Sequence, residues 1–359
     1  MTAVTAGVDR EPFASRLVAW QRLHGRHDLP WQGTNDPYYL WVSEIMLQQT
    51  QVTAVIPYYA RFMARFPDVR ALAGAHEDDV LAHWSGLGYY ARARNLHRAA
   101  QVVVEQHDGV FPSTAEALAG LPGVGRSTAA AIAAFAFGER AAILDGNVKR
   151  VLARWLGVSG WPGDAKVQVS LWEAAERLLP DHDIEAYTQG LMDLGSQVCT
   201  RTRPRCEACP VASDCVARRD GLTDRLPAAR PAKVLPQRET ALLVLARAGE
   251  VMLEKRPPTG IWGGLWSFPE LAVDEDPRHV SAQRYGAAIA PVEVLEPIEH
   301  GFTHFRLRLR PWLAAVTALT PQANAPGRLW LPVADAIGAA VPAPIRKLLM
   351  VLDSEKTKR

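Results

Sequence analysis

The sequence predicts an all-α N-terminal domain followed by an α+β C-terminal domain. At 359 residues the chain is long for a single hydrophobic core. Apolar residues recur with helical spacing over residues 12–215, whereas short alternating apolar runs, typical of strands, prevail in the last third. We therefore predict a helical domain at residues 1–219, a linker at 220–237 and a second domain at 238–359.

Capping residues predict the helix boundaries of the first domain. Asp36 precedes a proline and marks a helix start, since aspartate caps free N–H groups and proline suits the first turn. The Ser-Thr-Ala-Glu run at 113–116 indicates a capping box with Ser113 as the cap. A further apolar helix, Ala129–Phe137, is predicted to end at Gly138.

A proline-containing, basic stretch separates the two domains. Residues 200–238 contain nine Lys or Arg against four Asp or Glu, an excess larger than the +2 of the whole chain. Such a stripe suits the phosphates of DNA, but a solvated linker has the same composition, and both interpretations stay open here.

Strand patterns begin after the linker. Thr240–Ala246 is an apolar run, Ala248 and Gly249 form a turn, and a second run follows through Leu253. Over residues 305–310 apolar side chains alternate with arginines, which predicts a half-buried strand.

Composition indicates a cytoplasmic globular protein. Hydrophobic residues make up 48% and charged residues 22% of the chain. Met1–Arg10 has no apolar run of the secretory type, and Ala129–Phe137 is far shorter than the ~20 residues of a membrane span. Because cytoplasmic thiols stay reduced, a tight cysteine cluster there indicates metal binding.

All four cysteines lie within 17 residues, with spacings of six, two and five residues: Cys199, Cys206, Cys209 and Cys215. Four thiolates can bind zinc or a [4Fe–4S] cluster, and the spacing alone does not choose between them. Three arginines lie in the first of the loops between these cysteines. We therefore expect the metal to be structural and to position these cations for phosphate contact.

A glycine turn, Leu121–Gly125, directly precedes a predicted helix, whose free N–H groups would suit a phosphate. This turn, within residues 113–138, resembles the helix-hairpin-helix motif of the DNA glycosylase superfamily. The cysteine spacing resembles the [4Fe–4S] loop of the endonuclease III class, and this resemblance favours iron–sulfur over zinc.

Two carboxylates suit glycosidic bond cleavage. Asp145 follows two apolar residues and precedes a glycine, so it could face a developing positive charge on deoxyribose or simply cap a helix. Glu44 lies in the apolar segment Leu40–Leu47, where burial would raise its pKa and make it a general acid, unless it is exposed at a helix end. Together they would divide the work of acid and stabiliser.

Three motifs, at residues 43–52, 86–95 and 144–151, resemble the MutY family of adenine DNA glycosylases, and the likeness extends over nearly the whole chain. The resemblance implies excision of adenine mispaired with 8-oxoguanine or guanine in double-stranded DNA, by a monomer in the bacterial cytoplasm, at the nucleoid. Glu44 would protonate adenine N7, Asp145 would stabilise the oxocarbenium-like sugar, and Asn147 would position or polarise the site. The implied DNA-binding residues are Gln49, Thr50, Leu87, Tyr89, Gly123, Gly125, Ser127, Thr303 and His304.

Ser127 bears on the reaction type. Bifunctional relatives carry at this position a lysine that attacks the sugar and leads to strand cleavage. The serine predicts a monofunctional glycosylase that leaves an abasic site and lacks strong lyase activity. Lys149, four residues beyond Asp145, could still trap an abasic aldehyde adventitiously.

Ile261–Glu270 resembles the family's C-terminal domain, which has the Nudix hydrolase fold. Where the Nudix box requires carboxylates near positions 279, 282 and 283, this chain has His, Ala and Gln. Magnesium would have no carboxylate ligands at these positions, so we expect this domain to bind its ligand without hydrolysing a pyrophosphate. Phe302-Thr303-His304 corresponds to the family's Phe-Ser-His loop, which touches 8-oxoguanine.

Three alternatives are weighed against this interpretation. An endonuclease III-like lyase acting on oxidised pyrimidines is disfavoured by Ser127 and by the additional domain. A catalytically inactive DNA- or nucleotide-binding protein is disfavoured by the presence of both Glu44 and Asp145. Nucleotide-pool sanitation by the C-terminal domain is disfavoured by the missing carboxylates.

Overall fold

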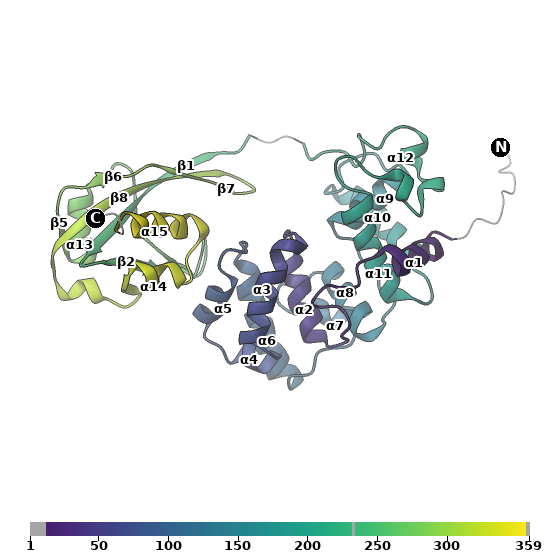
Figure 1. Cartoon of the computed structure of the whole chain (residues 1–359), viewed down its shortest axis with the longest axis horizontal. Coiled ribbons are helices and arrows are strands. Elements are labelled where there is room, and N and C mark those ends of the chain that lie inside the picture. Colours follow the sequence, from purple (N-terminus) through teal and green to yellow (C-terminus); the bar gives the residue numbers. More distant parts are fainter. Residues whose placement is uncertain (1–11, 232–233, 357–359) are drawn as a thin grey trace. The chain divides into compact units, whose positions relative to one another are not determined.

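The computed structural model describes residues 12–231 and 234–356 (Figure 1). The segment Met1–Arg10 and Lys233 of the basic stretch therefore lie outside the described residues. Chain contacts divide the protein into two units, the first comprising Met1–Ala73 and Arg98–Ala232 and the second Gly74–His97 and Lys233–Arg359. The division does not follow chain order, because Gly74–His97 clusters with the C-terminal residues.

The regular elements described in the first unit are all helical, as predicted. They are α1 (Phe13–His24), α2 (Pro37–Leu47), α3 (Val52–Arg65), α4 (Val69–Ala73), α7 (Ala115–Ala119), α8 (Arg126–Phe137), α9 (Gly146–Leu156), α10 (Ala165–Arg177), α11 (Ile184–Asp193) and α12 (Val216–Arg219). Short π and 3₁₀ turns occupy Leu194–Val198, Cys206–Ala208 and Ala212–Asp214. Helix α5 (Glu77–Trp84) lies in the second unit, and α6 (Ala91–His107) begins there and ends in the first.

Local capping explains several of the helix boundaries. The Asp36 side chain accepts a hydrogen bond from the Tyr38 N–H, and Gly138 ends α8 in the left-handed conformation, as predicted. The capping-box assignment was wrong by one residue. Thr114, not Ser113, is the N-cap of α7 and accepts from the Ala117 N–H, because its backbone is the extended one that enters the helix.

The core of the first unit is built around α9. Val148, Val151 and Leu152 pack with Leu17 of α1 and Leu171 of α10 in one buried cluster. Burial of each such side chain contributes roughly 1.5–3 kcal/mol. Helix α9 is therefore firmly fixed, and with it the residue at its N-terminus, Asp145.

The second unit contains a mixed sheet, which has nine strands in the described residues: β1 (Gln237–Arg247), β2 (Glu250–Lys255), β3 (Trp266–Ser267), β4 (Glu270–Leu271), β5 (Ala287–Ile289), β6 (Glu293–Val294), β7 (Ile298–Gly301), β8 (Arg306–Leu319) and β9 (Arg328–Pro332). The main path runs β3-β2-β1-β8-β5, with β1 and β8 parallel over their length. The predicted turn at Ala248 and Gly249 joins β1 to β2, and both residues have positive φ, as a tight hairpin requires.

The predicted alternation holds in β8. Leu307 and Leu309 are buried while Arg306 and Arg308 are exposed. Helices α13 (Pro277–Tyr285), α14 (Val333–Gly338) and α15 (Ala343–Lys356) complete this α+β unit (Figure 1).

None of the helices in the described residues is both long enough and apolar enough to cross a membrane.

Candidate active site

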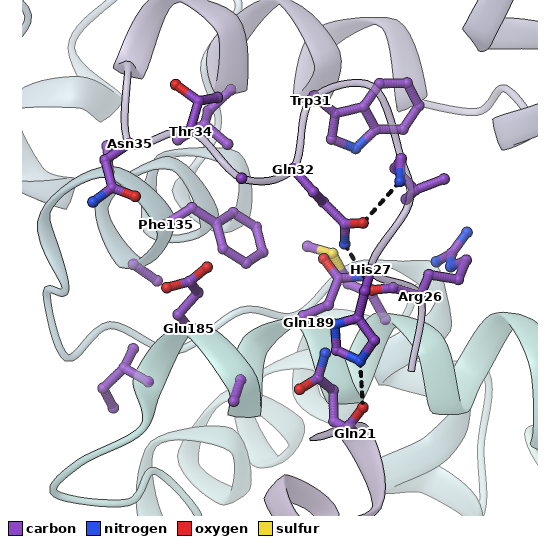
Figure 2. A pocket seen from close by; sticks show the side chains of 18 of the residues that line it. Gln21, Arg26, His27, Trp31, Gln32, Thr34, Asn35, Phe135, Glu185 and Gln189 are labelled. Atoms are coloured by element: carbon purple, nitrogen blue, oxygen red, sulfur yellow. Dashed lines mark hydrogen bonds between the residues drawn. The ribbon is translucent and has the colours of Figure 1, made fainter. Parts of the chain in front are cut away.

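A cavity of about 880 Å³ opens in the helical unit, and Glu44 is part of its wall. The loop that follows α1 forms one side, and the end of α8 with the start of α11 forms another. Figure 2 shows Trp31, Gln32 and His27 on the first side and Phe135 and Glu185 across from them. Aromatic, apolar and hydrogen-bonding groups together suit a flat heterocycle.

The loop on the first side is held by hydrogen bonds. Gln32 accepts from the Leu29 N–H at 3.0 Å and donates from Nε2 to the Arg26 carbonyl oxygen at 2.9 Å (Figure 2). The Arg26 backbone N–H and Nε donate to the fully buried carboxylate of Asp193 at 2.9 and 2.6 Å. No spacing in the sequence predicts this wall, because its residues meet only through tertiary packing.

Glu44 is on α2 among apolar residues, as predicted, and not at an exposed helix end. Burial, and to a lesser extent the negative charge of Asp145, together raise the pKa of its carboxyl group to about 8. At neutral pH the side chain therefore carries a proton that it can donate.

Asp145 is the N-cap of α9, and its carboxylate accepts from the Val148 N–H at 2.7 Å. Burial raises the pKa of Asp145, while hydrogen bonds from the backbone N–H groups of Val148 and Asn147 and the charges of Arg150 and Lys149 oppose the rise. Asp145 therefore caps α9 and also lies near Glu44. Asp145 is not among the described residues that line the cavity, but it is close enough for its charge to act on Glu44.

Asn147 is held in place by Arg150. The Arg150 Nη2 group donates to Asn147 Oδ1 at 2.7 Å and to the Gly195 carbonyl oxygen at 2.6 Å. A β-carbon on Gly195 would lie 2.6 Å from that of Asn147, so only glycine allows this approach. Arg150 Nε also donates to the Cys199 carbonyl oxygen at 2.7 Å, which links α9 to the cysteine loop.

The cysteine loop brings its four thiols around one cavity of about 30 Å³. Burial raises the pKa of Cys206, Cys209 and Cys215, and the neighbouring cysteines raise each of these pKa values in the same direction. In the part of the chain that the structure describes, no group of three or more His, Cys, Asp or Glu side chains has the geometry of a metal-ion site. Arg201, Arg203 and Arg205 are exposed on the same loop.

The glycine turn has the expected features only in part. Gly123 has a φ of 77°, but Gly125 has a φ of −86° and is the N-cap of α8. No side chain caps this helix, and the space around the position of a Gly125 β-carbon is open. The first N–H groups of α8 are thus free of a side-chain cap, as a phosphate site requires.

Ser127 has a contact that the sequence did not suggest. Its Oγ accepts a hydrogen bond from the Leu144 N–H at 2.9 Å, so it holds the backbone one residue before Asp145. The sequence separation of seventeen residues gives no signal for such a contact.

The remaining candidate DNA-binding residues lie at turns. Gln49 is exposed with a φ of 58°, and Thr50 follows it and closes the same turn by donating its backbone N–H to the Leu47 carbonyl oxygen. In the second unit, Tyr89 is 49% exposed with a φ of 50°, whereas Leu87 is only 8% exposed. Backbone in the left-handed region is rare for such residues and often marks functional positions.

In the C-terminal unit, Thr303 and His304 are exposed, and Phe302 stacks on Phe305 with ring centroids 4.5 Å apart. Glu270, the carboxylate that fits the Nudix pattern, is paired with Arg256. On α13, the residues at 279, 282 and 283 are exposed and include no carboxylate.

Comparisons with known proteins identify the families that the two parts of the chain resemble. Residues 42–177 match the HhH-GPD superfamily of base excision DNA repair proteins, and residues 240–351 match the NUDIX domain. A thermostable thymine-DNA glycosylase is 30% identical and covers 58% of this chain and 95% of its own, with a TM-score of 0.53. An endonuclease III in a non-covalent complex with DNA shares the fold, with 20% identity over 58% of this chain and 94% of its own and a TM-score of 0.50.

Curated relatives match at greater length. The adenine DNA glycosylase of Buchnera aphidicola subsp. Acyrthosiphon pisum is 34% identical over 94% of this chain and 96% of its own. The human adenine DNA glycosylase is 33% identical over 96% of this chain and 74% of its own. The chain therefore belongs to the adenine DNA glycosylase family of base excision repair enzymes.

Proposed function

We propose that this enzyme hydrolyses the N-glycosidic bond of adenine paired with 8-oxoguanine or guanine in duplex DNA and stops at an abasic site. The observation that carries the proposal is the position of Glu44 in the cavity wall, where desolvation and the charge of Asp145 raise the pKa of its carboxyl group to about 8. A protonated acid next to an ionised carboxylate is the pairing that this reaction requires.

In this mechanism the adenine base leaves the DNA double helix and enters the cavity beside Glu44. Glu44 donates its proton to N7, so the electron pair of the breaking C1′–N9 bond is taken up by a base that departs neutral. Asp145 stabilises the positive charge that develops on the sugar. Water then adds its oxygen to C1′ and loses a proton to the Glu44 carboxylate, which restores the acid and the balance of charge.

Asp145 must be ionised for this role. The N-terminus of α9 and the cations Lys149 and Arg150 favour its charged form and counter the effect of burial. The Arg150–Asn147 hydrogen bond supports the proposal that Asn147 positions the site, since it fixes the amide near this helix terminus.

The absence of a lysine at position 127 supports a monofunctional enzyme. A serine hydroxyl that accepts from the Leu144 N–H cannot form a Schiff base with the sugar. Lys149 Nζ donates to Gln168 Oε1 at 3.0 Å and is therefore already engaged.

We further propose that Cys199, Cys206, Cys209 and Cys215 hold a [4Fe–4S] cluster. Their spacing and their shared cavity fit four thiolate ligands. Such a cluster would fix the loop and its exposed arginines, which suits a structural and DNA-positioning role.

DNA is the proposed partner of the monomeric protein. Phosphate binding is assigned to the backbone at Gly123, Gly125 and Ser127, on the support of the uncapped N-terminus of α8. The other proposed DNA-contacting residues are Gln49, Thr50, Leu87, Tyr89, Thr303 and His304. The C-terminal unit would bind 8-oxoguanine and not hydrolyse nucleotides, because the carboxylates for magnesium are missing.

The test is product analysis under single-turnover conditions. Duplexes with adenine opposite 8-oxoguanine or guanine are incubated with excess enzyme, and samples are split with and without alkaline treatment. We expect free adenine and strand breaks only after alkali. Strand scission without alkali at the rate of base loss would contradict the monofunctional proposal, and no adenine release would contradict the substrate assignment.

A further inference from the structure

Two loops of the second unit are proposed to bind the 8-oxoguanine. Hydrogen bonds and ring contacts within the same unit connect these two loops. We name residues 86–89, with Leu87 and Tyr89, the wedge loop and residues 302–304 the sensor loop. Both belong to the body formed by Gly74–His97 and the C-terminal residues. The inference below rests on the proposed function and concerns how these loops are held.

The sensor loop packs against Trp262. The Trp262 ring lies 5.5 Å from that of His300 and 5.7 Å from that of Phe302, between centroids. Trp262 is only 8% exposed and has a φ of 53°, so its backbone is held in the left-handed region. A residue in that conformation persists only where its surroundings fix it.

The wedge loop is tied to the start of α6. Arg92 donates from Nη2 to the Gly88 carbonyl oxygen at 3.1 Å, and Trp84 Nε1 donates to the same oxygen at 3.1 Å. The Arg92 guanidinium also lies over the Tyr89 ring, 5.6 Å from its centroid. The position of this loop therefore follows the position of α6.

Arg94 connects α6, which holds the wedge loop, to the turn at Trp262, against which the sensor loop packs. It lies two residues beyond Arg92 on α6, and its Nη1 donates to the Gly263 carbonyl oxygen at 2.5 Å. Gly263 directly follows Trp262, and a β-carbon on it would lie 2.5 Å from the Pro258 carbonyl oxygen. The acceptor is thus in a tightly packed turn, and a shift of α6 would be transmitted to Trp262.

A second contact lies at the other end of the wedge loop. Ser85 Oγ donates to the Val341 carbonyl oxygen at 2.7 Å and accepts from Arg346 Nη2 at 2.8 Å. Ser85 is buried, so this polar contact is shielded from water. The wedge loop is therefore attached to the C-terminal residues on both sides.

We propose that Arg94 is a positioning residue for recognition of the base opposite adenine. Its bond to Gly263 sets the spacing of the wedge loop and the sensor loop, so that one base can meet both. Discrimination between 8-oxoguanine and guanine is a difference between two binding free energies. A loosened spacing weakens the contacts that only 8-oxoguanine makes, and the preference for 8-oxoguanine falls.

The experiment compares Arg94→Met with Arg284→Met as a matched control. Arg284 pairs with Glu275 at the surface of the same unit and contacts neither loop. Dissociation constants are measured for duplexes carrying a non-cleavable adenosine analogue opposite 8-oxoguanine or guanine. We expect the ratio of the guanine to the 8-oxoguanine dissociation constant to fall about fivefold or more in Arg94→Met, a change of the size of one net hydrogen bond, and to stay near wild type in Arg284→Met.

Two further variants separate positioning from general stability. Arg94→Lys keeps a cationic donor and should recover part of the ratio, at an unchanged melting temperature. In a His304→Ala background, Arg94→Met should lower the ratio by less than about twofold, because coupled residues are not additive. An unchanged ratio in Arg94→Met, full additivity with His304→Ala, or equal loss on both duplexes would overturn the inference.

The outcomes also distinguish this inference from the proposed function. A wild-type enzyme that releases no adenine contradicts the function itself. A wild-type enzyme that releases adenine but binds both duplexes equally contradicts the proposed recognition and this inference with it. A wild-type preference that Arg94→Met retains contradicts the positioning role alone.

Discussion

At the scale of the residue, the proposed chemistry depends on the charge states of two carboxyl groups, those of Glu44 and Asp145. Glu44 could be singled out from the sequence because an acid in an apolar helix is costly unless it holds its proton. Asp145 could be singled out from its motif, and the structure adds that it is also a helix cap. The hydrogen bond from Leu144 to Ser127 could not be predicted, because it depends on packing between segments far apart in the chain.

The raised pKa of Glu44 predicts the pH dependence of base excision. The acid is protonated below pH 8 and loses its proton above it, so the single-turnover rate should fall about tenfold per pH unit above pH 8. Because the charge of Asp145 contributes to the rise, the residual rate of Asp145→Asn should begin to fall at a lower pH. Rates measured from pH 6 to 10 test this, and a rate that increases across pH 8 would contradict it.

The same pKa predicts a stability difference. Between the ordinary value of 4.5 and about 8, the folded protein keeps a proton that the unfolded chain releases, so wild-type stability declines as pH rises through this window. Glu44→Gln should therefore be more stable than wild type at pH 8, by about 4 kcal/mol, with the gap closing toward pH 4.5. Denaturant unfolding at both pH values measures it. Equal stabilities at pH 8 would show that burial of Glu44 is not costly.

Ser127 should act through the backbone before Asp145. Ser127→Ala removes the acceptor of the Leu144 N–H, which should cost about 1 kcal/mol of stability and lower the excision rate. Ser127→Thr keeps the hydroxyl and should remain close to wild type. Single-turnover rates of the three proteins test the prediction, and an alanine variant as fast as wild type would refute a role in holding Asp145.

At the scale of the element, helix boundaries could be predicted from the sequence where a single capping residue determines them. Asp36 and Gly138 were predicted correctly, since each acts within one helical turn. The choice of Ser113 over Thr114 failed, because either hydroxyl could cap and only the backbone conformation decides between them. The cavity wall could not be predicted, because it combines the segments around α1, α2, α8 and α11, and no local signal indicates which of them meet.

Arg154 on α9 should be needed for the cysteine loop. It is buried and donates to the carbonyl oxygens of Leu226, Thr200 and Arg201 at 2.7, 2.6 and 3.1 Å. Arg154→Met leaves these acceptors without their donor, which should destabilise the protein by about 2 kcal/mol or more and lower the iron content. Melting temperature and iron per protein measure both effects.

Arg140→Met provides the control for that variant. Arg140 also donates to two backbone carbonyl groups, of Leu179 and Pro180, but at an exposed position where water can replace it. The melting temperature and the iron content of Arg140→Met should stay near those of wild type. Equal behaviour of the two variants would remove the special role of Arg154.

At the scale of the whole molecule, the order of an all-α part and an α+β part could be predicted from periodicity. The assignment of Gly74–His97 to the C-terminal body could not, because this helical segment carries the same pattern as its neighbours. Its membership depends on individual contacts such as Arg94 with Gly263, which no pattern encodes. The wedge loop is thereby part of the same body as the sensor loop.

Glu44 is proposed to supply the proton for adenine departure. The most direct measurement is the single-turnover rate of adenine release from a duplex with adenine opposite 8-oxoguanine, for wild type, Glu44→Gln and the control Glu185→Gln. Glu185 lines the same cavity from α11, so it tests for loss of a carboxylate as such. We predict that the rate of adenine release falls about a hundredfold or more in Glu44→Gln. Glu185→Gln should keep most of the wild-type rate. Release of adenine by Glu44→Gln at the wild-type rate would contradict the proposed role of Glu44 as the proton donor.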